Sequence, residues 1–241
     1  MKKFIKYFSI FEWCFYLISI AVIVICFIIF KNDNYFYLIG SIVGVTALIF
    51  LSKGHVLGQI ITVIFSVFYG IVSLSFKYYG EMITYMFMTM PIAIISIITW
   101  LKHPSKQKKN EVEVNELKWK EYIFLAILSL AVTFAFYFIL KAFNTNNLII
   151  STISILTSFV AAYLSMRRSR YYAIAYACND IVLIVLWILA SIEQTNYISM
   201  VICFVAFLAS DIYAFINWGR ILKQQKKRYH ACKVISFVFG Y

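Results

Sequence analysis

Eight long apolar runs constrain the fold of this chain more than any other feature of its sequence. Each run has roughly the 17 to 25 residues that a helix needs to cross the hydrocarbon core of a bilayer. A soluble domain is usually about half apolar and a quarter charged, whereas this chain of 241 residues is 63% hydrophobic and 13% charged. The sequence therefore predicts an all-α integral membrane protein, with crossings near 9–30, 35–52, 56–76, 81–101, 119–141, 147–165, 170–191 and 196–218.

The distribution of positive charge predicts the orientation of these helices. Loops rich in Lys and Arg stay in the cytoplasm, and the chain has 22 such residues against 10 acidic ones. If the N-terminus is inside, 19 of the 22 fall in cytoplasmic segments, so both termini are predicted to be cytoplasmic. The charges lie at helix ends, where contact with anionic lipid explains them. The expected partner is therefore the lipid bilayer, and no nucleic-acid partner is expected.

Two parts of the chain look like repeats of one three-helix unit. Both units end an apolar run with Trp and a cationic residue, in IITWLK at 97–102 and in FINWGR at 215–220. Both also begin with a similar apolar segment, LIGSIVGVT at 38–46 and LIISTISIL at 148–156. An extra crossing between two three-helix units gives both the same orientation. The predicted plan is one N-terminal helix plus a 3+1+3 helix core with two parallel three-helix repeats. Its parts are an N-terminal helix (1–34), a first repeat (35–102), a cytoplasmic loop and linker helix (103–141), a second repeat (142–219) and a cytoplasmic basic tail (220–241).

Residues that would indicate an enzyme or a metal site are sparse. His55, His103 and His230 are the only histidines, and they lie at helix boundaries or in loops without metal-ligand spacing. The sequence has no glycine-rich phosphate loop and no Ser-His-Asp set, and its five cysteines have no CxxC spacing. We therefore expect no enzymatic activity, no metal and no cofactor. The loop at 103–118 is expected to be solvated and mobile.

Asn179 and Asp180 stand side by side in the middle of an otherwise apolar run. Counted from Arg170 at the predicted inner boundary, they lie roughly 15 Å into a core about 30 Å thick. An Asp at that depth costs on the order of 2.5 to 3.5 kcal/mol on insertion scales, so a polar cavity or a partner is expected. Tyr172 and Tyr176 share the face of Asn179 through i, i+4, i+7 spacing. Two rings and an amide in line suit a planar heterocycle that carries a hydroxylated sugar.

Two other helices carry polar side chains on one face. Gln59, Thr62 and Ser66 are spaced by three and four residues, and Tyr213 and Asn217 by four. These five join the four residues above as candidate substrate-binding residues. Structural roles stay open for the same positions, because Ser and Thr often bond to helix backbone or to a neighbouring helix. Tyr residues near helix ends often anchor the membrane interface.

The order and spacing of these elements match a known family. The matching motifs are GHVLGQ at 54–59, FYG at 68–70, YYGE at 78–81, Trp100, RRSR at 167–170, the helix with Asn179 and Asp180, and DIYAFINW at 211–218. Through them the chain resembles the PnuC family of bacterial vitamin transporters over nearly its whole length after the first helix. The resemblance implies facilitated diffusion of an unphosphorylated, nucleoside-like small molecule across the bacterial inner membrane, with nicotinamide riboside as the substrate of the best-known members. It also implies a homotrimer and a cytosolic kinase that traps the product.

One departure from the family pattern leaves the substrate open. Members that carry nicotinamide riboside tend to have Trp on the helix where this chain has Tyr172 and Tyr176. A ribonucleoside, a deoxyribonucleoside, thiamine and riboflavin therefore stay alternative substrates. A proton-coupled carrier stays an alternative mechanism, because Asp180 or Asp211 could titrate. Asp211 could equally pair with a neighbour and fix the helix bundle.

Overall fold

The computed structural model describes residues 7–30, 35–75, 79–106, 111–193 and 195–239 of the chain. Eight crossings within these ranges are long and apolar enough to span a membrane, which confirms the predicted all-α membrane architecture. The fourth crossing combines two α-helices with a π-helical segment, and a short 3₁₀ helix, Thr195–Tyr197, precedes the last one. The elements are α2 (Ile10–Ile29), α3 (Tyr35–Ser52), α4 (Val56–Ser75), α5 (Tyr79–Ile83), the π segment (Thr84–Thr89), α6 (Met90–Lys102), α7 (Trp119–Ala142), α8 (Leu148–Met166), α9 (Tyr172–Glu193) and α10 (Ile198–Phe239).

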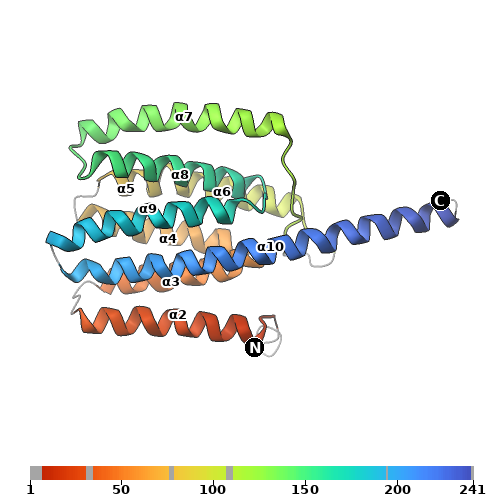
Figure 1. Cartoon of the computed structure of the whole chain (residues 1–241), viewed down its shortest axis with the longest axis horizontal. Coiled ribbons are helices and arrows are strands. Elements are labelled where there is room, and N and C mark those ends of the chain that lie inside the picture. Colours follow the sequence, from red (N-terminus) through yellow and green to blue (C-terminus); the bar gives the residue numbers. More distant parts are fainter. Residues whose placement is uncertain (1–6, 31–34, 76–78, 107–110, 194, 240–241) are drawn as a thin grey trace.

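Six of the crossings form a closed ring, and Figure 1 shows their helices lying lengthwise beside one another. Around the ring, α3 packs on α4, α4 on α6, α6 on α8, α8 on α9, α9 on α10, and α10 on α3 again. One half of the ring comes from α3 to α6 and the other from α8 to α10. The repeat relation between these halves and the domain boundaries stay predictions.

Two helices lie outside the ring, at opposite edges of the molecule (Figure 1). The N-terminal α2 packs against α3 and α10, and α7 packs against α8. On α7, Ile127, Leu130 and Phe134 are 65%, 63% and 67% exposed. Such a face is stable only against apolar surroundings, so α7 presents it to lipid or to another protein surface.

The loop at 103–118 is less solvated than predicted. Val112 and Val114 are buried, and the Val112 amide donates to the Gly54 carbonyl at 2.8 Å. Gly54 stands at the α3–α4 turn with a φ of +68°, a left-handed conformation that glycine adopts without strain. The loop therefore packs against this turn and covers the ring at that end, while residues 107–110 lie outside the described part.

Two helices differ from the predicted crossings. The fourth crossing contains the π segment, and at its end the Met90 amide donates to the Tyr85 carbonyl. The last crossing, predicted at 196–218 and followed by a tail, continues as α10 to Phe239 and projects beyond the bundle (Figure 1). No Gly or Pro lies between residues 220 and 239, so nothing in the backbone interrupts the helix.

The end of the ring near the chain termini, here called the termini end, is closed by a cluster of Trp100, Tyr172 and Trp218. All three side chains are fully buried. The Trp218 Nε1 and the Tyr172 hydroxyl both donate to the Leu51 carbonyl, at 2.9 and 3.1 Å. The Trp100 Nε1 donates to the Ser165 carbonyl at 2.9 Å. Buried hydrogen bonds thereby join α9 and α10 to the end of α3, and α6 to α8, which holds the ring shut at this end.

Candidate functional site

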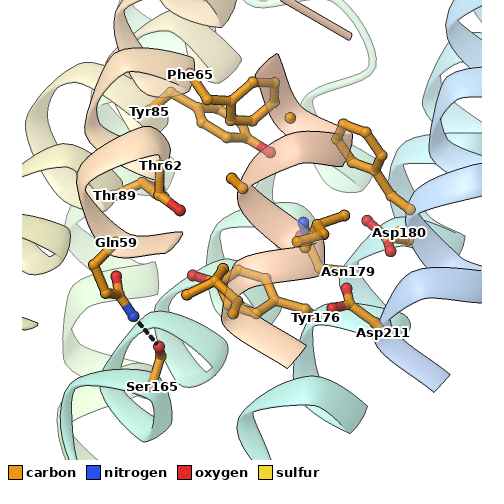
Figure 2. A pocket seen from close by; sticks show the side chains of 15 residues that line it. Gln59, Thr62, Phe65, Tyr85, Thr89, Ser165, Tyr176, Asn179, Asp180 and Asp211 are labelled. Carbon is orange, nitrogen blue, oxygen red and sulfur yellow. Dashed lines mark hydrogen bonds between the residues drawn. The ribbon is translucent and has the colours of Figure 1, made fainter. Parts of the chain in front are cut away.

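A cavity of about 50 Å³ lies inside the ring, above the tryptophan cluster. Side chains of α3, α4, the π segment, α8, α9 and α10 line it, so nearly every ring helix contributes. Figure 2 draws the side chains that line it and labels ten of them. Five of the nine residues that the sequence proposes for substrate binding are among the lining residues: Gln59, Thr62, Tyr176, Asn179 and Asp180.

Asn179 is held in one orientation by hydroxyl groups of α8. Its Oδ1 accepts hydrogen bonds from Thr157 Oγ1 and Ser158 Oγ, both at 2.8 Å, and from Ser154 Oγ at 3.5 Å. Within the described part of the chain, no hydrogen bond is formed by its Nδ2. An amide nitrogen is a donor only, so Asn179 offers the cavity two N–H groups and suits a ligand with a carbonyl or hydroxyl acceptor.

Two acidic side chains face the same cavity from neighbouring helices. Asp180 on α9 and Asp211 on α10 are 4% and 2% exposed, and their carboxyl groups interact with each other. Asp180 Oδ2 and Asp211 Oδ1 have no hydrogen-bond partner among the described residues. No Lys or Arg is among the residues that line the cavity. With two carboxyl groups and no basic side chain, this lining accepts a cation more readily than an anion.

The α4 side of the cavity is polar and tied to α8. Gln59 is 3% exposed, and its Nε2 donates to Ser165 Oγ at 2.7 Å, the bond dashed in Figure 2. Thr62 donates to the Gly58 carbonyl of its own helix at 2.9 Å. The Gln59 side-chain carbonyl and the Thr62 hydroxyl oxygen can therefore both accept a hydrogen bond from a ligand without breaking a bond, and the Gln59 Nε2 keeps a second N–H to donate.

Aromatic rings close the cavity on the side away from the termini end. Phe65 meets Tyr85 and Phe207 edge to face, with ring centroids 5.8 and 5.7 Å apart. Phe207 can approach only because Gly44 of α3 has no side chain, since a Cβ there would overlap the Phe207 ring. A cavity of about 50 Å³ is far smaller than the pockets of roughly 300 Å³ or more that hold drug-sized ligands. This structure is thus a closed one, and a ligand requires the rings to move.

Comparison with known proteins places this arrangement in a family. The family model described as nicotinamide mononucleotide transporter matches residues 34–220, which is most of the chain. The chain belongs to the nicotinamide mononucleotide transporter family. It is therefore a multi-pass membrane transporter and not an enzyme.

Two relatives of this transporter are both called nicotinamide riboside transporter PnuC, which confirms the predicted relationship to the PnuC family. The protein from Neisseria mucosa is 22% identical over 200 residues, covering 81% of this chain and 76% of the relative. That from Haemophilus influenzae is 22% identical over 193 residues, covering 80% and 82%. A crystal structure of the vitamin B3 transporter PnuC has a TM-score of 0.79 at 22% identity, covering 90% of this chain and 94% of that one, so the fold is shared.

Four residues that the sequence proposes for substrate binding do not line the cavity of this transporter. The Tyr172 hydroxyl is bonded to Leu51 at the termini end, and Ser66 Oγ donates to the Thr62 carbonyl at 2.9 Å. Asn217 Nδ2 donates to the Ser52 carbonyl at 2.8 Å, and the Tyr213 hydroxyl to Glu12 Oε1 at 2.7 Å. In this closed structure the four side chains hold the framework around the site.

The cavity of this transporter also contains residues absent from the sequence-based candidates. Phe65, Tyr85, Thr89 and Phe207 line it together with Asp211. Asp211 carries a signal in the sequence, because it is an acidic residue in an apolar run. The aromatic residues of the lining could not be singled out from the sequence, because the chain has 23 Phe and 18 Tyr. Only the rotation of each helix decides which of these rings face the cavity.

Proposed function

We propose that this chain carries nicotinamide riboside across the bacterial inner membrane by facilitated diffusion. The names of both relatives support this substrate. The single observation in the structure that favours it most is the pair of acidic side chains, Asp180 and Asp211, beside aromatic rings and the Asn179 amide. A flat cationic ring with an attached sugar matches all three features.

The charge of the ligand separates the alternative substrates. The pyridinium ring of nicotinamide riboside and the thiazolium ring of thiamine carry a permanent positive charge, whereas riboflavin and the common nucleosides are neutral. A cation among aromatic faces gains roughly 0.5 to 2 kcal/mol, and the carboxyl pair adds attraction in a medium of low dielectric constant. The amide acceptor and the ribose hydroxyls of nicotinamide riboside also suit the donor groups of Asn179, so we favour it over thiamine.

The remaining parts of this proposal follow from the family resemblance and the charge pattern. Both termini face the cytoplasm, a cytosolic kinase traps the transported riboside as its phosphate, and the transporter assembles as a homotrimer. The excess of Lys and Arg in the predicted inner segments supports the orientation. The exposed apolar face of α7 is compatible with lipid and with a subunit contact alike.

A binding panel tests the substrate. The purified protein is titrated by calorimetry with nicotinamide riboside, thiamine, riboflavin, a set of ribo- and deoxyribonucleosides, and nicotinamide mononucleotide. We expect nicotinamide riboside to bind roughly tenfold or more tightly than any neutral nucleoside. Its phosphate should bind more weakly than the riboside, because a phosphate adds negative charge near the two Asp side chains. Binding of phosphorylated forms alone would contradict the proposal.

A proton-coupled carrier is the second candidate, favoured by the facing carboxyls of Asp180 and Asp211. Such a pair can take up and release a proton as the cavity opens to one side and then to the other. A coupled carrier accumulates substrate when a pH gradient is imposed, whereas a facilitator only equilibrates it. Accumulation that disappears in Asp211→Asn would establish coupling.

A further inference from the structure

A separate cavity of about 190 Å³ lies at the termini end, away from the Asn179 cavity. Its walls are the loop at 103–118, the α3–α4 turn and the part of α10 between Asn217 and Arg228. The volume is more than ten times the roughly 10 to 15 Å³ that a single water needs. The proposed transport site does not include this cavity, so its lining invites a separate explanation.

Three basic side chains line this cavity together with one carboxylate. The basic residues are Lys53, Arg220 and Arg228, and the carboxylate is Glu111. Lys53 is already engaged, because its Nζ donates to both carboxylate oxygens of Glu12, at 2.9 and 3.0 Å. Within the ranges that the structure describes, neither Arg220 nor Arg228 forms a hydrogen bond or an ion pair. The two guanidinium groups are thus available to a ligand.

The two arginines belong to one row of side chains on α10. Arg220, Gln224 and Arg228 follow one another at steps of four residues, the spacing that places side chains on one side of a helix. The outer two are about 12 Å apart along the helix axis, and both reach the cavity. Gln225 lines it as well, and its Nε2 is buried without a hydrogen-bond partner in the described part of the chain. All three unpartnered groups are donors.

A phosphate group is the ligand whose chemistry fits this set of donors. A guanidinium is a planar fork whose N–H groups match phosphate oxygens in pairs. A phosphate monoester has three free oxygens and a charge of about −1.5 to −2 at pH 7, so it can accept from two guanidinium groups and an amide together. A carboxylate has only two oxygens and a single charge. Soluble phosphate esters and the headgroups of anionic lipids share this chemistry.

We propose that this cavity is a binding site for a phosphate group, with Arg220 and Arg228 as its main ligands and the Gln225 amide as a third donor. A phosphate bound there lies between α10 and the loop at 103–118, which contacts the α3–α4 turn through Val112. It therefore fastens the loop that covers the ring at the termini end. The site needs no aromatic ring on its ligand and does not depend on which substrate the transporter carries.

Titration of the purified full chain with glycerol 3-phosphate tests this inference. The compound carries a phosphate monoester but no ring, so the Asn179 cavity offers it little. We expect the variant that combines Arg220→Gln with Arg228→Gln to bind it roughly tenfold or more weakly than the parent, at constant ionic strength. Both arginines are exposed, so the variant should fold normally. Asn179→Leu should leave this affinity unchanged, which separates the test from that of the proposed transport function.

The matched control combines Lys223→Gln with Lys227→Gln. These lysines are exposed on the same helix and do not line the cavity, so the control removes the same charge from the same region. Its affinity for glycerol 3-phosphate should change less than twofold. An equal loss in the lysine and arginine variants would overturn the inference, because the attraction would then come from the general positive charge of α10.

Short-chain phosphatidic acid, titrated in place of glycerol 3-phosphate, distinguishes the two sources of phosphate. Tighter binding of the lipid, lost in the arginine variant, would support the site and identify a lipid headgroup as its ligand. Equal or weaker binding of the lipid, beside arginine-dependent binding of glycerol 3-phosphate, would support the site and identify a soluble phosphate ester. If neither compound distinguishes the parent from the arginine variant, the inference is wrong.

Discussion

Replacing Asn179 by Leu is expected to weaken ligand binding by about 1 to 3 kcal/mol, or roughly 5- to 150-fold. The variant keeps a side chain of similar volume but leaves the ligand acceptor without its donor. The protein should still fold, because Leu is inexpensive in a membrane helix, although Thr157 and Ser158 lose the acceptor that they share. Calorimetry with nicotinamide riboside measures the loss.

Asn217→Leu is the matched control for this substitution. Asn217 also lies on a ring helix, but its amide is bonded to the Ser52 carbonyl outside the cavity. The control should lower thermal stability and leave the affinity nearly unchanged. A well-folded Asn179→Leu protein that binds like the parent would show that Asn179 only joins α8 to α9.

Trp218→Ala is expected to cause the largest loss of stability in the chain, about 3 to 5 kcal/mol. The side chain is fully buried, packs on Trp100 and Tyr172 with ring centroids 5.7 and 4.8 Å away, and donates to the Leu51 carbonyl. Trp218→Phe should lose roughly 1 to 2 kcal/mol, since most of the volume remains but the hydrogen bond does not. Denaturant unfolding in detergent gives both values.

Trp119→Ala is the control for Trp218→Ala, because it also removes a Trp side chain but from an exposed position. Trp119 begins α7 and is 75% exposed, so its removal should change the free energy of unfolding by less than about 0.5 kcal/mol. Similar unfolding of the Trp218→Ala and Trp119→Ala proteins would contradict the view that the tryptophan cluster closes the ring.

The helix count could be predicted from the sequence because the bilayer imposes it. Backbone groups in hydrocarbon must be satisfied within each segment, so an apolar run of sufficient length has one structure available. The π segment could not be predicted, because TYMFMT at 84–89 has no feature that separates it from the α-helices on either side. The packing of the 103–118 loop depends on Val112 meeting the Gly54 turn, a contact between distant parts of the chain.

The cavity could be predicted only in part, and the reason is geometric. Residues spaced by three or four positions share a helix face. This rule correctly predicts that Gln59 and Thr62 line the same cavity. A face is wide, however, and the rotation of each helix is set by its neighbours. Tyr172 lies one turn below Tyr176 on the same face, yet its hydroxyl reaches the Leu51 carbonyl at the termini end instead of the cavity.

Transport of labelled nicotinamide riboside into vesicles that contain only this protein tests the central claim most directly. With no ATP and no ion gradient, we expect the substrate to equilibrate across the membrane and not to accumulate. Uptake should be faster than in protein-free vesicles, and Asn179→Leu protein inserted at the same density should slow it. Uptake no faster than in protein-free vesicles, or accumulation that requires a pH gradient, would contradict facilitated diffusion of nicotinamide riboside.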